Sequence, residues 1–197
     1  MSARDEILGR VRSALADAPE LPTARVPLRR PDRLTDLVEL FCDRVADYRA
    51  EVERCPPEEL DARLRAVIPD GARVVVPEGL GLDVAGSAVV DRALSAAALD
   101  RLDAVVTRAR LGIAETGTIV LDHGPGQGRR AITLVPDHHV CIVEASQVVA
   151  DVPDAFAVLD TTRPLTWVSG PSATSDIELD RVEGVHGPRH LHVIVVT

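Results

Sequence analysis

The stretch TIVLDHGPGQGRRAITLVPDHHVCIVEA, residues 118–145, determines how the fold is interpreted. It contains three short aliphatic runs, TIVLD at 118–122, AITLVP at 131–136 and HVCIVEA at 139–145, each typical of a β-strand. The runs follow one another with no room for a helix. Strands this close in sequence need antiparallel or hairpin-like pairing, so we expect a mixed sheet.

Further strands and helices alternate outward from this stretch. The other aliphatic runs lie at 72–77, 103–109, 165–170 and 191–197. Helical patterns lie between some of them, at 95–102, 146–159 and 175–184, and Ser95 is suited to cap the first of these. Such alternation predicts an α/β layered domain with a largely parallel sheet.

The amino-terminal third is helical. Ser2 can cap an amphipathic helix with Ile7, Val11 and Leu15 on one face, and four prolines then make an extended tether. We therefore expect an arm at 1–31 and an α/β domain at 32–197, with a helical lead-in at 32–69. The stripe of the arm is expected to pack on its own domain or on a second protein.

Two aromatic residues of the lead-in, Phe41 and Tyr48, fall on the apolar face of the helix predicted at 32–55. They are the expected core anchors of that helix. A following helix is predicted at 56–69.

Composition excludes several functions. The net charge of -9 argues against nucleic acid as a partner. All 22 cationic residues are arginine, so any side-chain cation that meets a ligand is a guanidinium, which suits carboxylate or phosphate. The three cysteines are far apart, and neither a metal site nor an iron–sulfur cluster is predicted in this chain. Without a signal sequence or a long apolar run, we expect a cytoplasmic protein with no membrane span.

One glycine-rich loop is a candidate for ligand binding. It contains the candidate residues Gly124, Gly126, Gly128, Arg129 and Arg130. The glycines precede a predicted strand rather than a helix, so they do not fit a dinucleotide fingerprint. The loop either cradles an anion or is a hairpin turn that uses positive φ angles. Because neighbouring strand residues point to opposite faces, only one of the two arginines is expected to face a given pocket.

A second candidate loop follows the run at 165–170. Its candidate residues are Ser169, Gly170, Ser172, Thr174, Ser175 and Asp176. One hydroxyl suffices to cap the helix predicted there, so the surplus favours an anionic ligand, with capping alone as the alternative. The carboxyl end of a strand in an open α/β sheet is also a common ligand position. We expect the two loops to converge on one small anion.

Two further residues are catalytic candidates. Glu115 is suited to act as a base, as a nucleophile or only as a turn residue. Gly117, two residues later in ETG, is a further candidate for ligand binding. His186, in GVHGP, suits acid–base work or an interior hydrogen bond. His190 and His192 share a face of the last strand, but no metal-binding motif accompanies them.

The motifs AETGTIVLDHGPGQGRRAITLVPDHHVCIV and SGPSATSDIE followed by GVHGP resemble the lactate utilization protein C family, the LUD domain. The resemblance runs from about residue 70 to the end. It implies the NagB/RpiA-like α/β architecture shared by phosphosugar isomerases, formyltetrahydrofolate cyclo-ligases and CoA transferases. It also implies a cluster-free component that oxidises L-lactate to pyruvate together with iron–sulfur partner proteins.

Two other functions remain open from the residues. The ETG sequence is similar to the E-x-G of CoA transferases, which allows a stand-alone transferase or isomerase that acts on a small carboxylate or phosphate ester. A non-catalytic assembly or regulatory subunit that docks through the arm is the third possibility. Homo-oligomerisation is undecided at this stage.

Overall fold

The computed structural model describes residues 2–17, 36–84, 87–174, 182–184 and 187–197. The chain divides into two compact units, Met1–Arg33 and Leu34–Thr197. The first unit contains helix α1 (Ala3–Leu15), which opens with the predicted Ser2 cap. The Ser2 hydroxyl accepts a hydrogen bond from the Asp5 amide, and the Asp5 carboxylate accepts one from the Ser2 amide, so the cap is reciprocal.

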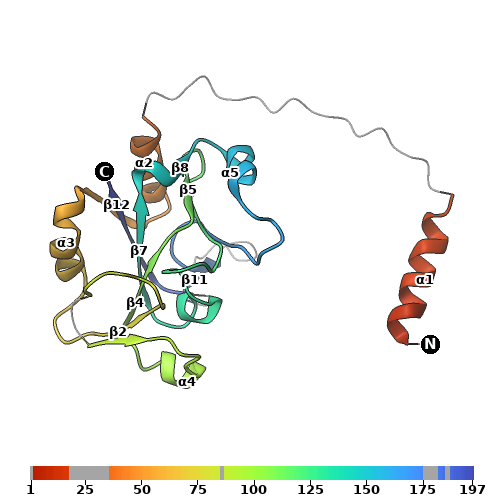
Figure 1. Ribbon diagram of the computed structural model, residues 1–197, viewed down its shortest axis with the longest axis horizontal. Coiled ribbons are helices and arrows are strands. Elements are labelled where there is room, and N and C mark those ends of the chain that lie inside the picture. Colours follow the sequence, from red (N-terminus) through yellow and green to blue (C-terminus); the bar gives the residue numbers. More distant parts are fainter. Residues whose placement is uncertain (1, 18–35, 85–86, 175–181, 185–186) are drawn as a thin grey trace. The chain divides into compact units, whose positions relative to one another are not determined.

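The second unit is built on a six-stranded parallel sheet (Figure 1). Its order is β1-β12-β7-β4-β2-β3, and every neighbouring pair is parallel. The strands are β1 (Glu51–Cys55), β2 (Arg73–Val76), β3 (Ser87–Val90), β4 (Ala104–Arg108), β7 (His138–Glu144) and β12 (His190–Val196). The central strands are aliphatic on both faces, as a sheet covered on both sides requires.

The antiparallel pairs belong to smaller sheets. A four-stranded sheet in the order β8-β5-β6-β9 comprises β5 (Leu111–Ile113), β6 (Thr118–Leu121), β8 (Val148–Val149) and β9 (Thr166–Val168). A hairpin pairs β10 (Ala173–Thr174) with β11 (Val182–Glu183). The α/β class is confirmed. Antiparallel pairing is present, but only outside the main sheet among the described strands, and TIVLD and HVCIVEA lie in different sheets.

The predicted strand AITLVP is wrong. Residues Arg130–Thr133 form a 3-10 helix, η2, in which Ile132 and Thr133 are buried. A β-branched run is compatible with any buried segment, and here tertiary packing, with Ile132 against Val75 and Val105, overrides the strand preference.

Helices cover the two faces of the main sheet. They are α2 (Leu37–Asp47), η1 (Pro57–Glu59), α3 (Leu60–Val67), α4 (Ala96–Leu99), η3 (Ala145–Gln147) and α5 (Val152–Val158). Helix α3 packs on one face, while α2 and the smaller sheet pack on the other. Helix α5 covers the far side of the smaller sheet, and Figure 1 shows α3 and α5 on opposite sides of the main sheet.

Only one of the two predicted core anchors in the lead-in is buried. Phe41 of α2 is fully buried, whereas Tyr48 is 41% exposed, so that part of the prediction is wrong. The helix ends at Asp47, and the chain turns at Tyr48 to enter β1, which the sequence pattern did not predict. Helix 146–159 was also predicted too long, since η3 and β8 occupy its first part.

Candidate functional site

A hollow of about 230 Å³ joins part of the glycine-rich loop to the second loop. Residues from both loops line it: Arg130, Ser169, Gly170 and Ser172. The other lining residues are Thr133, Leu134, His139, Trp167, Val168, Pro171, Gly187, Pro188 and Leu191. Its volume lies just below the range of roughly 300–1,000 Å³ for drug-sized ligands, so it suits a small molecule.

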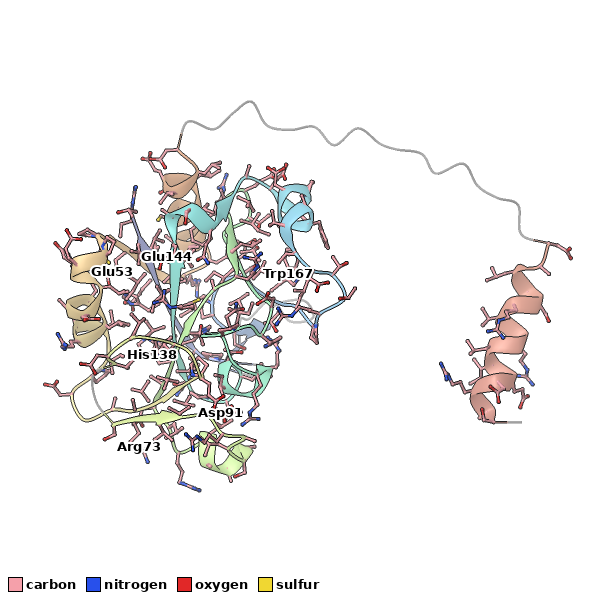
Figure 2. All side chains as sticks on the ribbon, viewed as in Figure 1. Glu53, Arg73, Asp91, His138, Glu144 and Trp167 are labelled. Carbon is pink, nitrogen blue, oxygen red and sulfur yellow. The ribbon has the colours of Figure 1, made fainter. Side chains whose placement is uncertain are left out.

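We expected a ligand at the carboxyl end of a strand, but the hollow lies at the amino-terminal end of the main sheet. His139 and Leu191 are second residues of β7 and β12, so the hollow adjoins the amino ends of these parallel strands. The second loop does follow the carboxyl end of a strand, but that strand is β9 of the smaller sheet. Figure 2 labels Trp167 of β9 and also His138 and Glu144, which begin and end β7.

Contacts with three other segments fix the second loop. Gly170 has φ of 77°, and a Cβ there would lie 2.7 Å from the Tyr48 Cβ, so only glycine fits. The Ser169 hydroxyl lies 2.8 Å from the Thr118 hydroxyl. The Ser172 amide donates to the Pro188 carbonyl at 2.8 Å. The backbone of the loop is therefore held in place around the hollow.

Arg130 supplies the cationic side chain of this hollow. It begins η2 and is exposed, and the Thr133 hydroxyl donates to its carbonyl at 3.1 Å. Among the described residues it forms no ion pair, and it is the only charged residue lining the hollow. An unpaired guanidinium is available for two parallel hydrogen bonds to a carboxylate.

Arg129, the preceding residue, is engaged in an ion pair. Its Nε and Nη2 donate to the Asp91 carboxylate at 2.6 and 3.0 Å, and the Asp91 side chain is only 5% exposed. These hydrogen bonds to Arg129 lower the pKa of Asp91. Arg129 and Arg130 therefore line different hollows, but strand alternation is not the reason, because Arg130 begins the 3-10 helix η2.

Arg129 and two of the predicted glycines instead line a second, more open hollow of about 620 Å³. It lies beyond the carboxyl ends of β2 and β3 and includes Gly124 and Gly128. The other lining side chains with cationic or titratable nitrogens also have hydrogen-bond partners. His123 bonds the Gly128 carbonyl through Nδ1 and the Thr166 hydroxyl through Nε2, and Arg163 donates to Asp122. Because these side chains are already bonded within the protein, the first hollow is the better candidate for an anion site.

The glycine-rich loop is shaped by a residue that the sequence reasoning missed, Gln127. Its Oε1 accepts from the Asp122 amide at 2.7 Å, and its Nε2 donates to the Asp122 carboxylate at 2.8 Å. A Cβ on Gly128 would lie 2.5 Å from the Ile132 Cδ1, and Gly126 has φ of 76° beside Arg108. Close packing and positive φ angles therefore explain why glycines occupy these positions of the loop. No sequence motif indicated these structural roles.

Glu115 does not line either of these hollows. It is exposed in the turn between β5 and β6, where its amide donates to the Ala150 carbonyl at 3.0 Å. Hydroxyl contacts connect this turn to Ser169 at the first hollow, since Thr116 contacts Thr118 and Thr118 contacts Ser169, each at 2.8 Å.

Gly117, in the same turn, is expected to be required for folding. Its φ is 58°, and a Cβ there would lie 2.6 Å from the Arg44 carbonyl carbon at the end of α2. Gly117→Ala should lower the free energy of unfolding by more than the roughly 1–2 kcal/mol of a left-handed residue alone. Urea denaturation measures this.

Gly81→Ala is the matched control, since Gly81 has φ of 69° with nothing within 4 Å of the added Cβ. Equal losses in the two variants would contradict a role for the contact with Arg44.

Three of the predicted site residues, Ser175, Asp176 and His186, lie outside the described residues. Thr174 lies in β10, where it pairs with Val182. The helix predicted at 175–184 is wrong at its described end, because Val182 and Glu183 form β11.

His139 lines the hollow and was not among the predicted site residues. It is 2% exposed, and its Nε2 lies 2.8 Å from the Thr107 hydroxyl of β4. The same hydroxyl donates to the Cys141 Sγ at 3.7 Å. Burial lowers the pKa of His139 to about 4 and raises that of Cys141 to about 12, so both are neutral at pH 7.

Acid is expected to destabilise the protein through His139. The unfolded imidazole binds a proton near its ordinary pKa of 6.5, whereas the folded one binds it only near pH 4. The free energy of unfolding should therefore fall as the pH drops from 6.5 to 4, by on the order of 3 kcal/mol. The carboxylates Asp91 and Asp137, whose pKa values are lowered from 3.8, lose their contribution only below this window.

His139→Gln should flatten most of this slope, as measured by urea denaturation at several pH values. A smaller slope should remain because burial also lowers the pKa of His138. An unchanged slope in His139→Gln would show that another group causes the acid sensitivity.

His138, His190 and His192 lie on the face of the main sheet opposite to His139. His138 and His190 are register partners with edge-to-face rings, and His192 hydrogen-bonds Glu51 and Glu53. In the described part of the chain, no group of three or more His, Cys, Asp or Glu residues could hold a metal ion. Within the same part, no helix is long and apolar enough to cross a membrane.

The fold and the hollow together define an α/β domain with a parallel sheet and a small, singly cationic pocket between two loops. The LUD domain model matches residues 88–196, which include both loops. The chain belongs to the LUD domain family, as its motifs indicated.

Two relatives are similar to different extents. Lactate utilization protein C of Deinococcus radiodurans is 42% identical over 98% of this chain and 95% of its own. Lactate utilization protein C of Bacillus licheniformis is 35% identical over 46% of this chain and 41% of its own. The second alignment thus spans less than half of that protein.

A solved structure has a similar fold. The crystal structure of a DUF162 family protein from Deinococcus radiodurans superposes with a TM-score of 0.72 at 40% sequence identity. The match covers 85% of this chain and 100% of that one. The α/β architecture is therefore that of a solved member of this group of proteins.

Proposed function

We propose that this protein is a component of an L-lactate utilization system that binds a small carboxylate in the first hollow. The observation that carries the proposal is the 42% identity with a lactate utilization protein C over nearly the whole of both chains. Such extended similarity covers the arm, the lead-in and both loops, so it supports a shared role more strongly than a shared fold does.

The chemistry of the hollow supports a monocarboxylate as the ligand. Arg130 offers one guanidinium without an ion-pair partner among the described residues, and Ser169 and Ser172 line the hollow beside it. The second hollow has its arginines paired with Asp91 and Asp122. A carboxylate in the first hollow would meet a cation with capacity to bind it.

We further propose that iron–sulfur partner proteins complete the reaction. Oxidation of L-lactate to pyruvate releases two electrons and two protons, and the electrons would pass to clusters in the partners. This chain would then hold the acid and contribute no cluster of its own. Glu115 is exposed outside the hollow, so its position gives no support to a stand-alone transferase that uses it.

Deletion of the gene tests the function in cells. Loss of growth on L-lactate, with growth on pyruvate retained, is the expected result, and a plasmid copy of the gene should restore it. Normal lactate oxidation in the deletion strain would refute the proposal. Co-purification of the tagged protein with iron–sulfur proteins from lactate-grown cells tests the partner part separately.

A further inference from the structure

Helix α5 has an exposed apolar face. Three consecutive residues, Phe156, Ala157 and Val158, are exposed, and both Phe156 and Val158 are 50% exposed. The inner side of the helix packs on the smaller sheet through Ala155. Asp154 is the only charged residue of the helix. A surface helix ordinarily has polar residues on its outer face, whereas a helix that is apolar all round is covered by other elements. The outer face of α5 is therefore unusual for a single chain.

An aromatic contact extends this face beyond the helix. Trp167 of β9 is 37% exposed, and its ring centroid lies 5.7 Å from that of Phe156. The chain has only one tryptophan, one tyrosine and two phenylalanines, so an exposed pair of them is notable. Tryptophan and phenylalanine are enriched at protein–protein interfaces. We call residues 156–158 and Trp167 the α5 surface, and its composition indicates a contact with another protein.

The charges around the α5 surface are complementary to themselves. Asp154 lies in the first turn of the helix. At the other end, Arg110 Nη2 donates to the carbonyl of the last helical residue at 3.3 Å, and the Arg110 side chain stays 45% exposed beside Asp122. The segment after the helix adds one exposed charge of each sign, Asp160 and Arg163. A surface with an acidic end and a basic end fits a second copy of itself in the antiparallel direction.

We propose that the α5 surface is a dimer interface, on which a second copy of this chain packs with its own α5 antiparallel across a two-fold axis. At 100° per residue, Ala157 lies between Phe156 and Val158 on the outer face, and its small side chain lets the two helices approach closely. Asp154 of each copy then lies near Arg110 of the other. Trp167 also lines the first hollow, so the interface adjoins one wall of the candidate ligand site.

Sedimentation velocity of the full chain tests this inference over roughly 1 to 200 μM, which spans moderate dimer affinities. We expect a dimer of two 21.1 kDa chains at the upper end of this range. Val158→Asp places a charge at the centre of the contact and should raise the dissociation constant at least about tenfold. Val90→Asp is the matched control and should remain dimeric. Val90 is 42% exposed and lies on the α3 face of the main sheet, where its register partner Val76 belongs to the core.

Disulfide cross-linking tests the orientation of the two helices. The two copies of residue 157 lie close to the proposed axis, so Ala157→Cys should form a disulfide-linked dimer on mild oxidation. Ala97→Cys is the control, since Ala97 is an exposed alanine of α4. It should remain unlinked under the same conditions. This readout does not depend on how well Val158→Asp folds.

The outcomes decide the inference without reference to the ligand. A wild-type protein that is monomeric over the whole range would overturn it, whatever else covers α5. A dimer that persists in Val158→Asp and does not cross-link through residue 157 would place the contact elsewhere and would overturn it as well. Both results are independent of whether the deletion strain grows on L-lactate, so the proposed function succeeds or fails separately.

Discussion

Arg130→Gln is expected to weaken L-lactate binding by about 10- to 100-fold, because a hydrogen bond to a charged group contributes about 1.5–3 kcal/mol. Arg130 is exposed and unpaired among the described residues, so its loss should not change the midpoint of thermal unfolding. Calorimetry and thermal denaturation of the same sample measure both quantities. Cells that carry this variant should also fail to grow on L-lactate.

The adjacent residue provides the matched control. Arg129→Gln should leave L-lactate affinity close to that of the wild type and lower the melting temperature, because Asp91 loses its bidentate partner. The two variants differ by one position and remove the same charge. If Arg129→Gln abolished binding and Arg130→Gln did not, the ligand would belong in the second hollow.

Phe41→Ala is expected to lower the free energy of unfolding by about 3–5 kcal/mol, as for other fully buried aromatic residues. The ring lies between α2 and the smaller sheet, where a Cβ on Gly112 would come within 2.9 Å of it. Protein interiors are close-packed, so the cavity left by Phe41 should collapse only in part. Urea denaturation measures the loss.

Phe156→Ala is the control of the same residue type. Phe156 is 50% exposed and contacts Trp167 at a ring-centroid distance of 5.7 Å, so its removal should cost far less. Losses of similar size in both variants would contradict the assignment of the core to Phe41.

Much of the fold could be predicted from local patterns. Aliphatic runs identified β2, β4, β7 and β12, because buried strands of a parallel sheet are apolar on both faces. They also identified β6 and β9 of the smaller sheet. Strand β1 was missed because EVERC at 51–55 is mostly polar and continues the spacing of α2. Its register with β12 depends on a segment about 140 residues away, which no local pattern contains.

The candidate site could be predicted in part. The two loops were proposed from the sequence, as was the expectation that only one of Arg129 and Arg130 faces a given pocket. Which of the two is paired depends on Asp91, 38 residues from Arg129. In the sequence, His139 is only the first residue of the aliphatic run HVCIVEA, with no motif that marks it as a site residue. Its hydrogen bond to Thr107 spans 32 residues, so its role at the hollow required the structure.

The glycines illustrate the same limit. Gly117 and Gly170 were predicted as ligand-binding residues, and both have positive φ and backbone neighbours that exclude a side chain. A glycine in a loop signals an unusual backbone, but the sequence does not say whether a ligand or a neighbouring segment requires it.

The most direct test of the central claim is a crystal structure of the protein with L-lactate, with pyruvate, phosphate and CoA as parallel soaks. We expect lactate in the first hollow, with its carboxylate on Arg130. Lactate bound at the carboxyl ends of β2 and β3 beside Arg129, or phosphate or CoA in place of lactate in the first hollow, would contradict it.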